Sequence, residues 1–149
     1  MTDDSIQHNK PISWNTYFME IAKISAKRSK DPNTQVGACI VGEDNKILGM
    51  GYNGFPRGCP DDKFPWTRPD KYLYVVHAEV NAILNSSKVT GARLYSTLMP
   101  CNECAKIIIQ AGIREVIYLE NRNDSQEYDA ARRMFDSAGV KHGIFIHDP

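Results

Sequence analysis

Apolar segments of two different periodicities alternate along this chain, and their order constrains the fold more than any other feature. Four segments have the spacing of amphipathic helices, at residues 13–30, 78–85, 102–111 and 127–138. Five short segments rich in β-branched and aromatic residues have the character of strands, at 36–41, 47–52, 93–98, 115–119 and 140–146. The order helix–strand–strand–helix–strand–helix–strand–helix–strand predicts an α/β fold, in which one mixed sheet carries helices on its faces.

The domain organisation follows from the same pattern. Residues 1–12 are polar and are predicted to form a flexible leader, and Ser13 is the expected N-cap of the first helix. Residues 13–149 are predicted to form a single domain, because no linker or repeat interrupts them and their length suffices for a proper core. The apolar face of the first helix, from Trp14 to Ile24, is expected to lie in that core, and residues 72–76 are expected to be extended. The long irregular stretch 53–70 is unusual in a compact domain and is predicted to be functional or disordered.

Charge and composition argue against a protein that binds long nucleic acid and against a membrane protein. The chain has 18 basic and 18 acidic side chains. A protein that binds long nucleic acid normally has an excess of basic residues, because they neutralise the phosphates. No apolar run approaches the roughly 20 residues of a membrane-spanning helix, and the acidic N-terminus does not resemble a signal peptide. Four cysteines without an export signal favour metal or redox chemistry over disulfides, so a cytoplasmic location is expected.

Three residues have the identity and spacing of zinc ligands. His77 stands where an extended segment meets a predicted helix, and Cys101 and Cys104 stand at the start of the next helix. Zinc binds imidazole and thiolate, and a catalytic zinc uses three protein ligands with a fourth position for water. The two-residue gap lets both thiolates reach one ion, and the helix start favours the negatively charged sulfur.

Glu79 turns this metal site into a candidate active site. Zinc lowers the pKa of a bound water to about 7, and a carboxylate two residues from a ligand is close enough to accept and deliver protons. The pattern His-x-Glu followed by Pro-Cys-x-x-Cys matches the signature of zinc deaminases. A structural zinc site would need a fourth ligand from His142, His147, Cys39 or Cys59, and none has ligand spacing. A redox Cys pair would leave His77 and Glu79 unexplained.

Two further groups are candidates for substrate binding, each with a simpler alternative. Ser29 and Lys30 are predicted to hold a monophosphate, although Lys30 equally fits a solvated helix end. Asn53 is predicted to bond a sugar hydroxyl, although the same residues suit an ordinary turn. Cys39 is expected to be a small buried residue and Cys59 an unreactive thiol.

The sequence resembles the deoxycytidylate deaminases of the cytidine deaminase superfamily over nearly its whole length. Besides the two zinc motifs, the resemblance lies in Ser29-Lys-Asp-Pro-Asn, Gln35-Val-Gly-Ala-Cys-Ile-Val and Gly51-Tyr-Asn-Gly-Phe-Pro-Arg-Gly-Cys. It extends to Asp61-Asp-Lys-Phe-Pro-Trp66. The zinc motifs alone indicate only the superfamily, and the other segments point to dCMP.

The resemblance implies a three-layer α-β-α fold around a five-stranded mixed sheet, and hydrolysis of dCMP to dUMP and ammonia. It implies a substrate contact at Ala78 and a homo-hexamer. Some relatives hold a second zinc with extra Cys and His in the long loop, but this loop has only Cys59 and no histidine, so one zinc per chain is predicted. The resemblance also implies that dUMP is supplied for thymidylate synthesis, with dCTP and Mg²⁺ activating and dTTP inhibiting. The implied regulatory site contains Asn53, Gly54, Arg57, Gly58, Asp61, Asp62 and Trp66.

Three alternatives remain open on the sequence. A related enzyme would deaminate another cytosine nucleotide, dCTP or CMP. A tRNA or polynucleotide deaminase would need a basic approach that the net charge disfavours. A non-catalytic nucleotide sensor would use zinc only to hold its fold, and Glu79 is the residue that distinguishes it from an enzyme.

Overall fold

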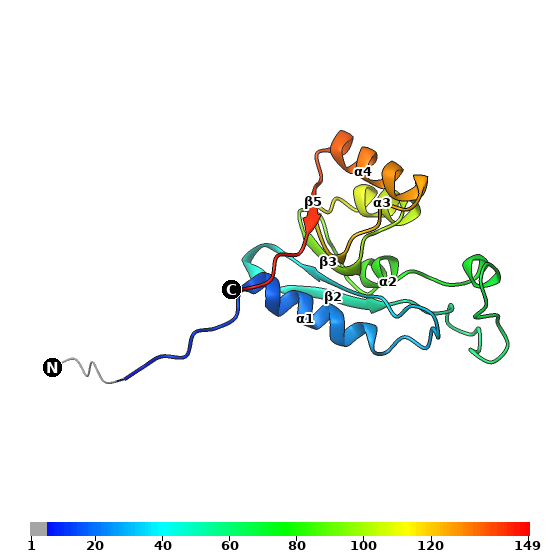
Figure 1. Ribbon diagram of the computed structural model, residues 1–149, viewed down its shortest axis with the longest axis horizontal. Coiled ribbons are helices and arrows are strands. Elements are labelled where there is room, and N and C mark those ends of the chain that lie inside the picture. Colours follow the sequence, from blue (N-terminus) through cyan, green and yellow to red (C-terminus); the bar gives the residue numbers. More distant parts are fainter. Residues whose placement is uncertain (1–5) are drawn as a thin grey trace.

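A mixed five-stranded sheet forms the centre of the computed structural model, which describes residues 6–149 (Figure 1). The strands lie in the order β2 (Ile47–Tyr52), β1 (Gly37–Val41), β3 (Arg93–Leu98), β4 (Glu115–Glu120) and β5 (Lys141–Ile144). Strand β1 is antiparallel to both β2 and β3, whereas β3, β4 and β5 are parallel to one another. The predicted mixed sheet is confirmed.

Four helices cover the two faces of this sheet (Figure 1). Helix α1 (Trp14–Ala26) packs on one face, where Phe18, Met19 and Ala22 share a core with Cys39, Val41 and Tyr95. Helices α2 (Ala78–Leu84), α3 (Asn102–Gln110) and α4 (Gln126–Ala138) belong to the other face, whose core includes Ala38, Ile40, Ala82, Leu94, Ile108 and Phe135. Because alternate residues of β1 and β3 enter opposite cores, the three-layer α-β-α architecture is confirmed.

The ends of the first and last helices follow the expected chemistry. The Ser13 hydroxyl accepts a hydrogen bond from the backbone N–H of Thr16 at 3.1 Å, which confirms the predicted N-cap. The same hydroxyl donates to the Asp148 carboxylate at 2.7 Å, so the C-terminal segment is held against the start of α1. Gly139 ends α4 with a φ of 73°, a left-handed conformation that favours glycine.

The apolar face predicted for the first helix is only partly buried. Trp14, Tyr17 and Ile24 are 57%, 42% and 59% exposed, so the expectation that this face lies in the core was wrong for these three residues. The helix is rotated so that Phe18 and Met19, with the small residues Ala22 and Ala26, face the sheet. Small side chains let the helix approach the strands closely. The spacing of apolar residues alone did not indicate which side of the helix would pack on the sheet.

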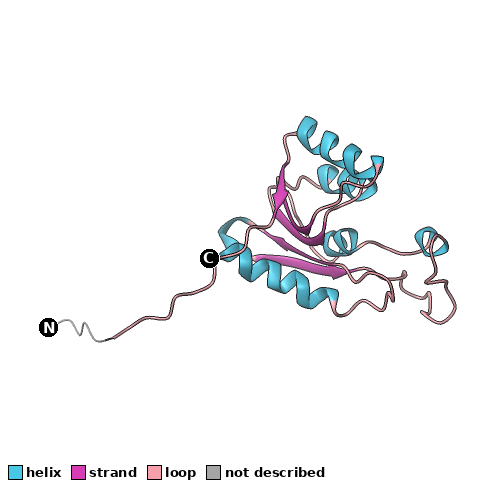
Figure 2. Ribbon diagram, viewed as in Figure 1, coloured by secondary structure: helices cyan, strands magenta, loops and turns pink. Residues whose placement is uncertain are grey.

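The first helix and the last strand are shorter than predicted, and the connection before α2 also differs from the sequence prediction. Residues 70–73, partly predicted to be extended, form a short 3₁₀ helix, and only Val76 pairs with Gly54 in a β-bridge. Figure 2 shows this short helix within the long connection from β2 to α2. Residues 6–12 have no regular secondary structure, residues 1–5 of the predicted leader lie outside the described residues, and the leader's flexibility stays a prediction. None of the described helices is long and apolar enough to cross a membrane.

A buried ion pair ties this long connection to the segment between α1 and β1. Lys71 Nζ lies 2.6 Å from Asp31 Oδ2, and the side chains are only 4% and 1% exposed. Asp31 Oδ1 also accepts hydrogen bonds from the backbone N–H groups of Asn33 and Thr34, at 2.8 and 3.2 Å. Burial alone would raise the pKa of Asp31, but Lys71 and these N–H groups outweigh burial, and the pKa is lowered.

Glycine 51 allows α2 to lie directly on strand β2. A Cβ atom at Gly51 would meet the backbone N of Ala82 at 2.4 Å and the backbone O of Ala78 at 2.5 Å. Neither backbone atom can move without shifting α2. The absence of a side chain at this position therefore fixes the distance between β2 and the helix that follows His77.

We expect Gly51→Ala to lower the free energy of unfolding by about 1–3 kcal/mol, because the added methyl group overpacks the β2–α2 contact. Chemical denaturation measures this change. Gly143→Ala is the matched control, since a Cβ at Gly143 would meet no atom within 4 Å. Equal stability of the two variants would contradict the close approach.

We expect Asp31→Asn and Lys71→Met to lower the free energy of unfolding by about 3–5 kcal/mol each, because either change leaves its buried partner unpaired. The double variant should lose much less than the sum, as denaturation of all four proteins will show. Because the folded-state pKa of Asp31 is lowered, its contribution is complete above the ordinary aspartate pKa of about 4. That contribution is lost as the pH falls through the folded-state pKa, so the wild type and Asp31→Asn should converge in stability in acid. A constant difference would refute the assignment.

Candidate metal and substrate site

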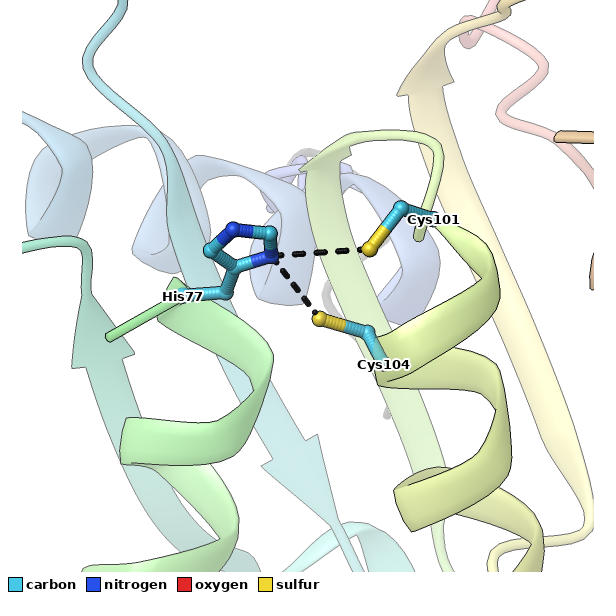
Figure 3. Close-up of side chains that lie close together, drawn as sticks. All are labelled: His77, Cys101 and Cys104. Carbon is cyan, nitrogen blue, oxygen red and sulfur yellow. Dashed lines mark hydrogen bonds between the residues drawn. The ribbon is translucent and has the colours of Figure 1, made fainter. Parts of the chain in front are cut away.

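Two helix starts bring the three predicted zinc ligands together. His77 is the N-cap residue of α2, Cys101 is the N-cap residue of α3, and Cys104 lies in the first turn of α3. Figure 3 shows the imidazole pointing from α2 toward both sulfur atoms. His77 Nδ1 lies 3.1 Å from Cys104 Sγ and 3.6 Å from Cys101 Sγ. All three ligand atoms lie within 4.8 Å of one another.

This arrangement fits a tetrahedral zinc ion. With Zn–N and Zn–S distances of about 2.0 and 2.3 Å, tetrahedral ligand atoms stand roughly 3.6 Å apart, close to the separations found here. Nitrogen and thiolate sulfur are the donors that zinc prefers. Within residues 6–149 no other set of three His, Cys, Asp or Glu side chains converges in this way. The residues present therefore fit one zinc ion with three protein ligands.

The spare ligands considered from the sequence lie elsewhere. Cys39 is buried in the core beneath α1, on the opposite side of the sheet. His142 Nε2 lies 2.7 Å from an Asp136 carboxylate oxygen, and the His147 ring packs on Phe145. Neither these residues nor Cys59 belongs to the ligand cluster. The fourth coordination position is thus not filled by any of them.

Glu79 lies in the first turn of α2 and is buried beside the ligands. Burial raises the pKa of its carboxyl, against the lowering effects of the Cys104 thiol, His77 and the Ser96 hydroxyl. The Ser96 hydroxyl on β3 is 2.9 Å from Glu79 Oε1 and 2.7 Å from the Leu98 carbonyl oxygen. A hydroxyl can donate to an ionised carboxylate or accept from a protonated one. Ser96 therefore holds Glu79 in the same place in both protonation states.

Without a metal, the two cysteines differ in pKa, and Cys101 ionises before Cys104. A hydrogen bond from the Cys104 thiol lowers the pKa of Cys101 to about 4, against burial and with help from His77. The pKa of Cys104 is raised in turn, first by this same bond and then by burial. Cys101 is thus predisposed to be the first thiolate. Because both sulfurs must be ionised to bind zinc, metal uptake at this site releases protons.

A pocket opens directly onto this cluster. His77, Glu79 and Cys101 form one end of its lining. The remaining lining residues come from the α1–β1 segment, the long β2–α2 connection, the first residue of α2, the end of β3 with the residue that follows it, the segment after β4, and α4. They are Asp31, Thr34, Val36, Asn53, Arg68, Lys71, Tyr72, Val75, Ala78, Leu98, Met99, Arg122 and Tyr128.

The pocket contains some of the predicted substrate residues and not others. Asn53 and Ala78 line it, but Ser29 and Lys30 do not. The buried Ser29 hydroxyl donates to the Asn53 carbonyl at 2.9 Å, and Lys30 Nζ lies 2.5 Å from Asp61 at the surface. The Asn53 amide donates to the Thr34 carbonyl at 2.9 Å and accepts from the backbone N–H of Val36. Asn53 thus holds the wall of the pocket through its own side chain.

The residues predicted for a regulatory site lie along the long connection. Gly54 pairs with Val76, Arg57 and Asp62 are exposed, and Gly58 has a φ of 84°. The Asp61 carbonyl accepts from the Trp66 indole at 3.2 Å, and Trp66 packs on Phe55 with ring centroids 4.1 Å apart. Phe55 also contacts Phe64, which contacts Tyr74. These aromatic rings give the connection a small core of its own.

The sequence did not indicate Ser96, which contacts Glu79, or several residues that line the pocket. Ser96 was recognisable only as a polar residue on the inner side of a strand, since it follows Leu94 by two positions. Lys71, Arg68, Arg122 and Tyr128 carried no local signal. Each reaches the pocket through a loop or helix start whose position depends on distant segments.

A family model and the sequences of known relatives identify the same family for this chain. A family model for the cytidine and deoxycytidylate deaminase zinc-binding region matches residues 12–120. The deoxycytidylate deaminase of Homo sapiens is 56% identical over 144 residues, which cover 91% of this chain and 81% of that protein. The probable deoxycytidylate deaminase of Drosophila melanogaster is 52% identical over 153 residues, covering 93% and 75%.

A solved structure supports the same family. The dCMP deaminase from the cyanophage S-TIM5, in a crystal structure with dCMP and dUMP, aligns with a TM-score of 0.71 and 30% identity. The alignment covers 93% of this chain and 100% of that chain. The family match includes all three ligands and Glu79. This chain is therefore a member of the cytidine and deoxycytidylate deaminase family, as both its zinc motifs and its sheet topology indicate.

Proposed function

We propose that this protein hydrolyses dCMP to dUMP and ammonia at the site formed by His77, Glu79, Cys101 and Cys104. The observation that carries the proposal is a buried carboxylate beside three convergent zinc ligands at the end of a pocket. The relatives named above as deoxycytidylate deaminases support dCMP as the substrate. The cyanophage enzyme with dCMP and dUMP supports it as well.

The reaction exchanges the amino group on C4 of cytosine for an oxygen from water. Zinc held by His77, Cys101 and Cys104 supplies Lewis acidity that makes water a nucleophile at neutral pH. Glu79 accepts a proton as the water oxygen adds to C4, and delivers it to the ring nitrogen N3. As the C4–N bond breaks, Glu79 carries the second proton of the water to the departing amine, which leaves as ammonia. The raised pKa that burial gives Glu79 suits a group that must both hold and release a proton.

Substrate binding is proposed for four residues. Asn53 and Ala78 lie in the wall beside His77, which supports contacts with the sugar and the base. Ser29 and Lys30 are proposed to contribute to phosphate binding from the segment just before Asp31. For Lys30 this contact would replace its exposed pairing with Asp61.

Regulation and assembly complete the proposal. We infer that dCTP with Mg²⁺ activates and dTTP inhibits, and that the regulatory nucleotide contacts Asn53, Gly54, Arg57, Gly58, Asp61, Asp62 and Trp66. A homo-hexamer, a cytoplasmic location and a supply of dUMP for thymidylate synthesis belong to the same proposal. The resemblance to deoxycytidylate deaminases supports each of these points.

Ammonia release from a panel of substrates tests the reaction. We expect the zinc-loaded protein to act on dCMP with a kcat/KM at least tenfold above the values for CMP, dCTP and deoxycytidine. A cytosine-bearing oligonucleotide should be a still poorer substrate, since the chain lacks a basic excess. Each assay is repeated with dCTP–Mg²⁺ and with dTTP. Activity on the oligonucleotide alone would contradict the proposal, and a preference for CMP or dCTP would reassign the substrate.

Glu79→Gln tests the proton shuttle. We expect this variant to keep one zinc per chain and the wild-type stability, while kcat falls by at least about 10³-fold because the amide cannot carry protons. Atomic absorption measures zinc, and thermal unfolding controls for the fold. Cys104→Ser is the contrasting variant, which should lose zinc together with activity. Near-normal turnover by Glu79→Gln would remove Glu79 from the mechanism and favour a non-catalytic nucleotide sensor.

A further inference from the structure

Two arginines in the pocket wall have no part in the chemistry described so far. Arg68 comes from the long β2–α2 connection, and Arg122 comes from the segment between β4 and α4. Both line the same pocket as His77 and Glu79. Two positive charges that line one pocket are stabilised by a negative charge, which either a bound anion or a nearby carboxylate supplies.

The position of Arg122 is fixed by a second arginine. Arg132 on α4 donates hydrogen bonds to the Asn121 side-chain oxygen at 2.8 Å and to that of Asn123 at 2.9 Å. It also donates to the Arg122 carbonyl and contacts Met99 Sδ at 3.1 Å. Met99 precedes the ligand segment that begins at Pro100. Arg132 therefore fastens the backbone that carries Arg122 next to the metal ligands.

The guanidinium of Arg122 is held by two contacts, and its ion pair lies at the surface. It lies over the Tyr128 ring at 5.9 Å from the centroid and pairs with Asp124 at 3.2 Å. The Asp124 side chain is 62% exposed, and an exposed pair of this kind contributes little free energy. Arg122 can thus exchange Asp124 for a ligand at small cost.

Arg68 has only a neutral partner. Its Nη2 donates to the Thr34 hydroxyl at 2.9 Å, and Thr34 also lines the pocket. In the described part of the chain no carboxylate lies within 4.0 Å of the Arg68 guanidinium. The Thr34 contact aims the guanidinium without cancelling its charge.

Among the described residues, the exposed Asp124 is the only carboxylate that pairs with either of these two arginines. Lys71 is neutralised inside the wall by Asp31. A phosphate monoester carries a charge of about −1.5 to −2 at pH 7, and arginine binds phosphate oxygens with paired N–H donors. The excess charge therefore suits one monophosphate group.

We propose that Arg68 and Arg122 bind the 5′-phosphate of the nucleotide while its base reaches Glu79. This inference rests on the proposed function and assigns the phosphate to the pocket itself. Ser29 and Lys30, which lie outside the pocket lining, would then be at most secondary contacts. The two arginines select nucleotides over nucleosides.

Kinetics with paired substrates test the assignment. Arg122→Gln and Arg68→Gln should each lower kcat/KM for dCMP by about ten- to a hundredfold, the loss expected for a charged hydrogen bond. The value for deoxycytidine should change by less than about twofold, which also shows that each variant folds. Arg133→Gln, an exposed arginine of α4 outside the pocket, is the matched control and should leave both values unchanged.

Product binding separates this inference from the proposed function. Calorimetry should show that both variants bind dUMP more weakly than the wild type does, by the same factor as their loss of kcat/KM for dCMP. The affinity for deoxyuridine should not change. If the wild type binds dUMP but releases no ammonia from dCMP, the proposed function fails while the phosphate assignment is still measured. Equal losses on nucleotide and nucleoside would overturn the assignment. So would a selective loss in Lys30→Ala with none in the arginine variants.

Discussion

The whole site depends on the starts of α2 and α3 lying side by side on one face of the sheet. His77 and Cys101 are the residues just before these helices, and Cys104 follows one turn later. One metal can be held only if the two starts stay within a few ångströms of each other. The contact of Gly51 with α2 fixes one of the two helices against the sheet, because the β2 backbone packs directly on the α2 backbone.

A second set of interactions builds the pocket around this centre. The Asp31–Lys71 pair and the hydrogen bonds of Asn53 join the α1–β1 segment to the long β2–α2 connection. Such polar groups are costly to bury, and their mutual pairing offsets that cost. The long connection therefore forms a fixed wall in front of the metal ligands.

Two parts of the pocket lining differ in electrostatic character. At the metal end Glu79 is enclosed, and the Ser96 hydroxyl can bond it whether it is ionised or protonated. Elsewhere in the lining, Arg68 pairs with a hydroxyl and Arg122 with an exposed carboxylate. Proton transfer benefits from the first environment, and anion binding benefits from the second.

The sequence by itself determined the family and the order of the elements, and it predicted the residues of the metal site. The zinc ligands and Glu79 form two short motifs, and the strands at 47–52 and 93–98 have the predicted bounds, because local spacing carries both kinds of information. Only the tertiary structure decided that Trp14 and Ile24 are exposed, that Ser96 contacts Glu79, and that Lys71 and Arg122 reach the pocket. These outcomes depend on contacts between segments that are distant in the sequence, and such contacts cannot be predicted from a residue's neighbours along the chain.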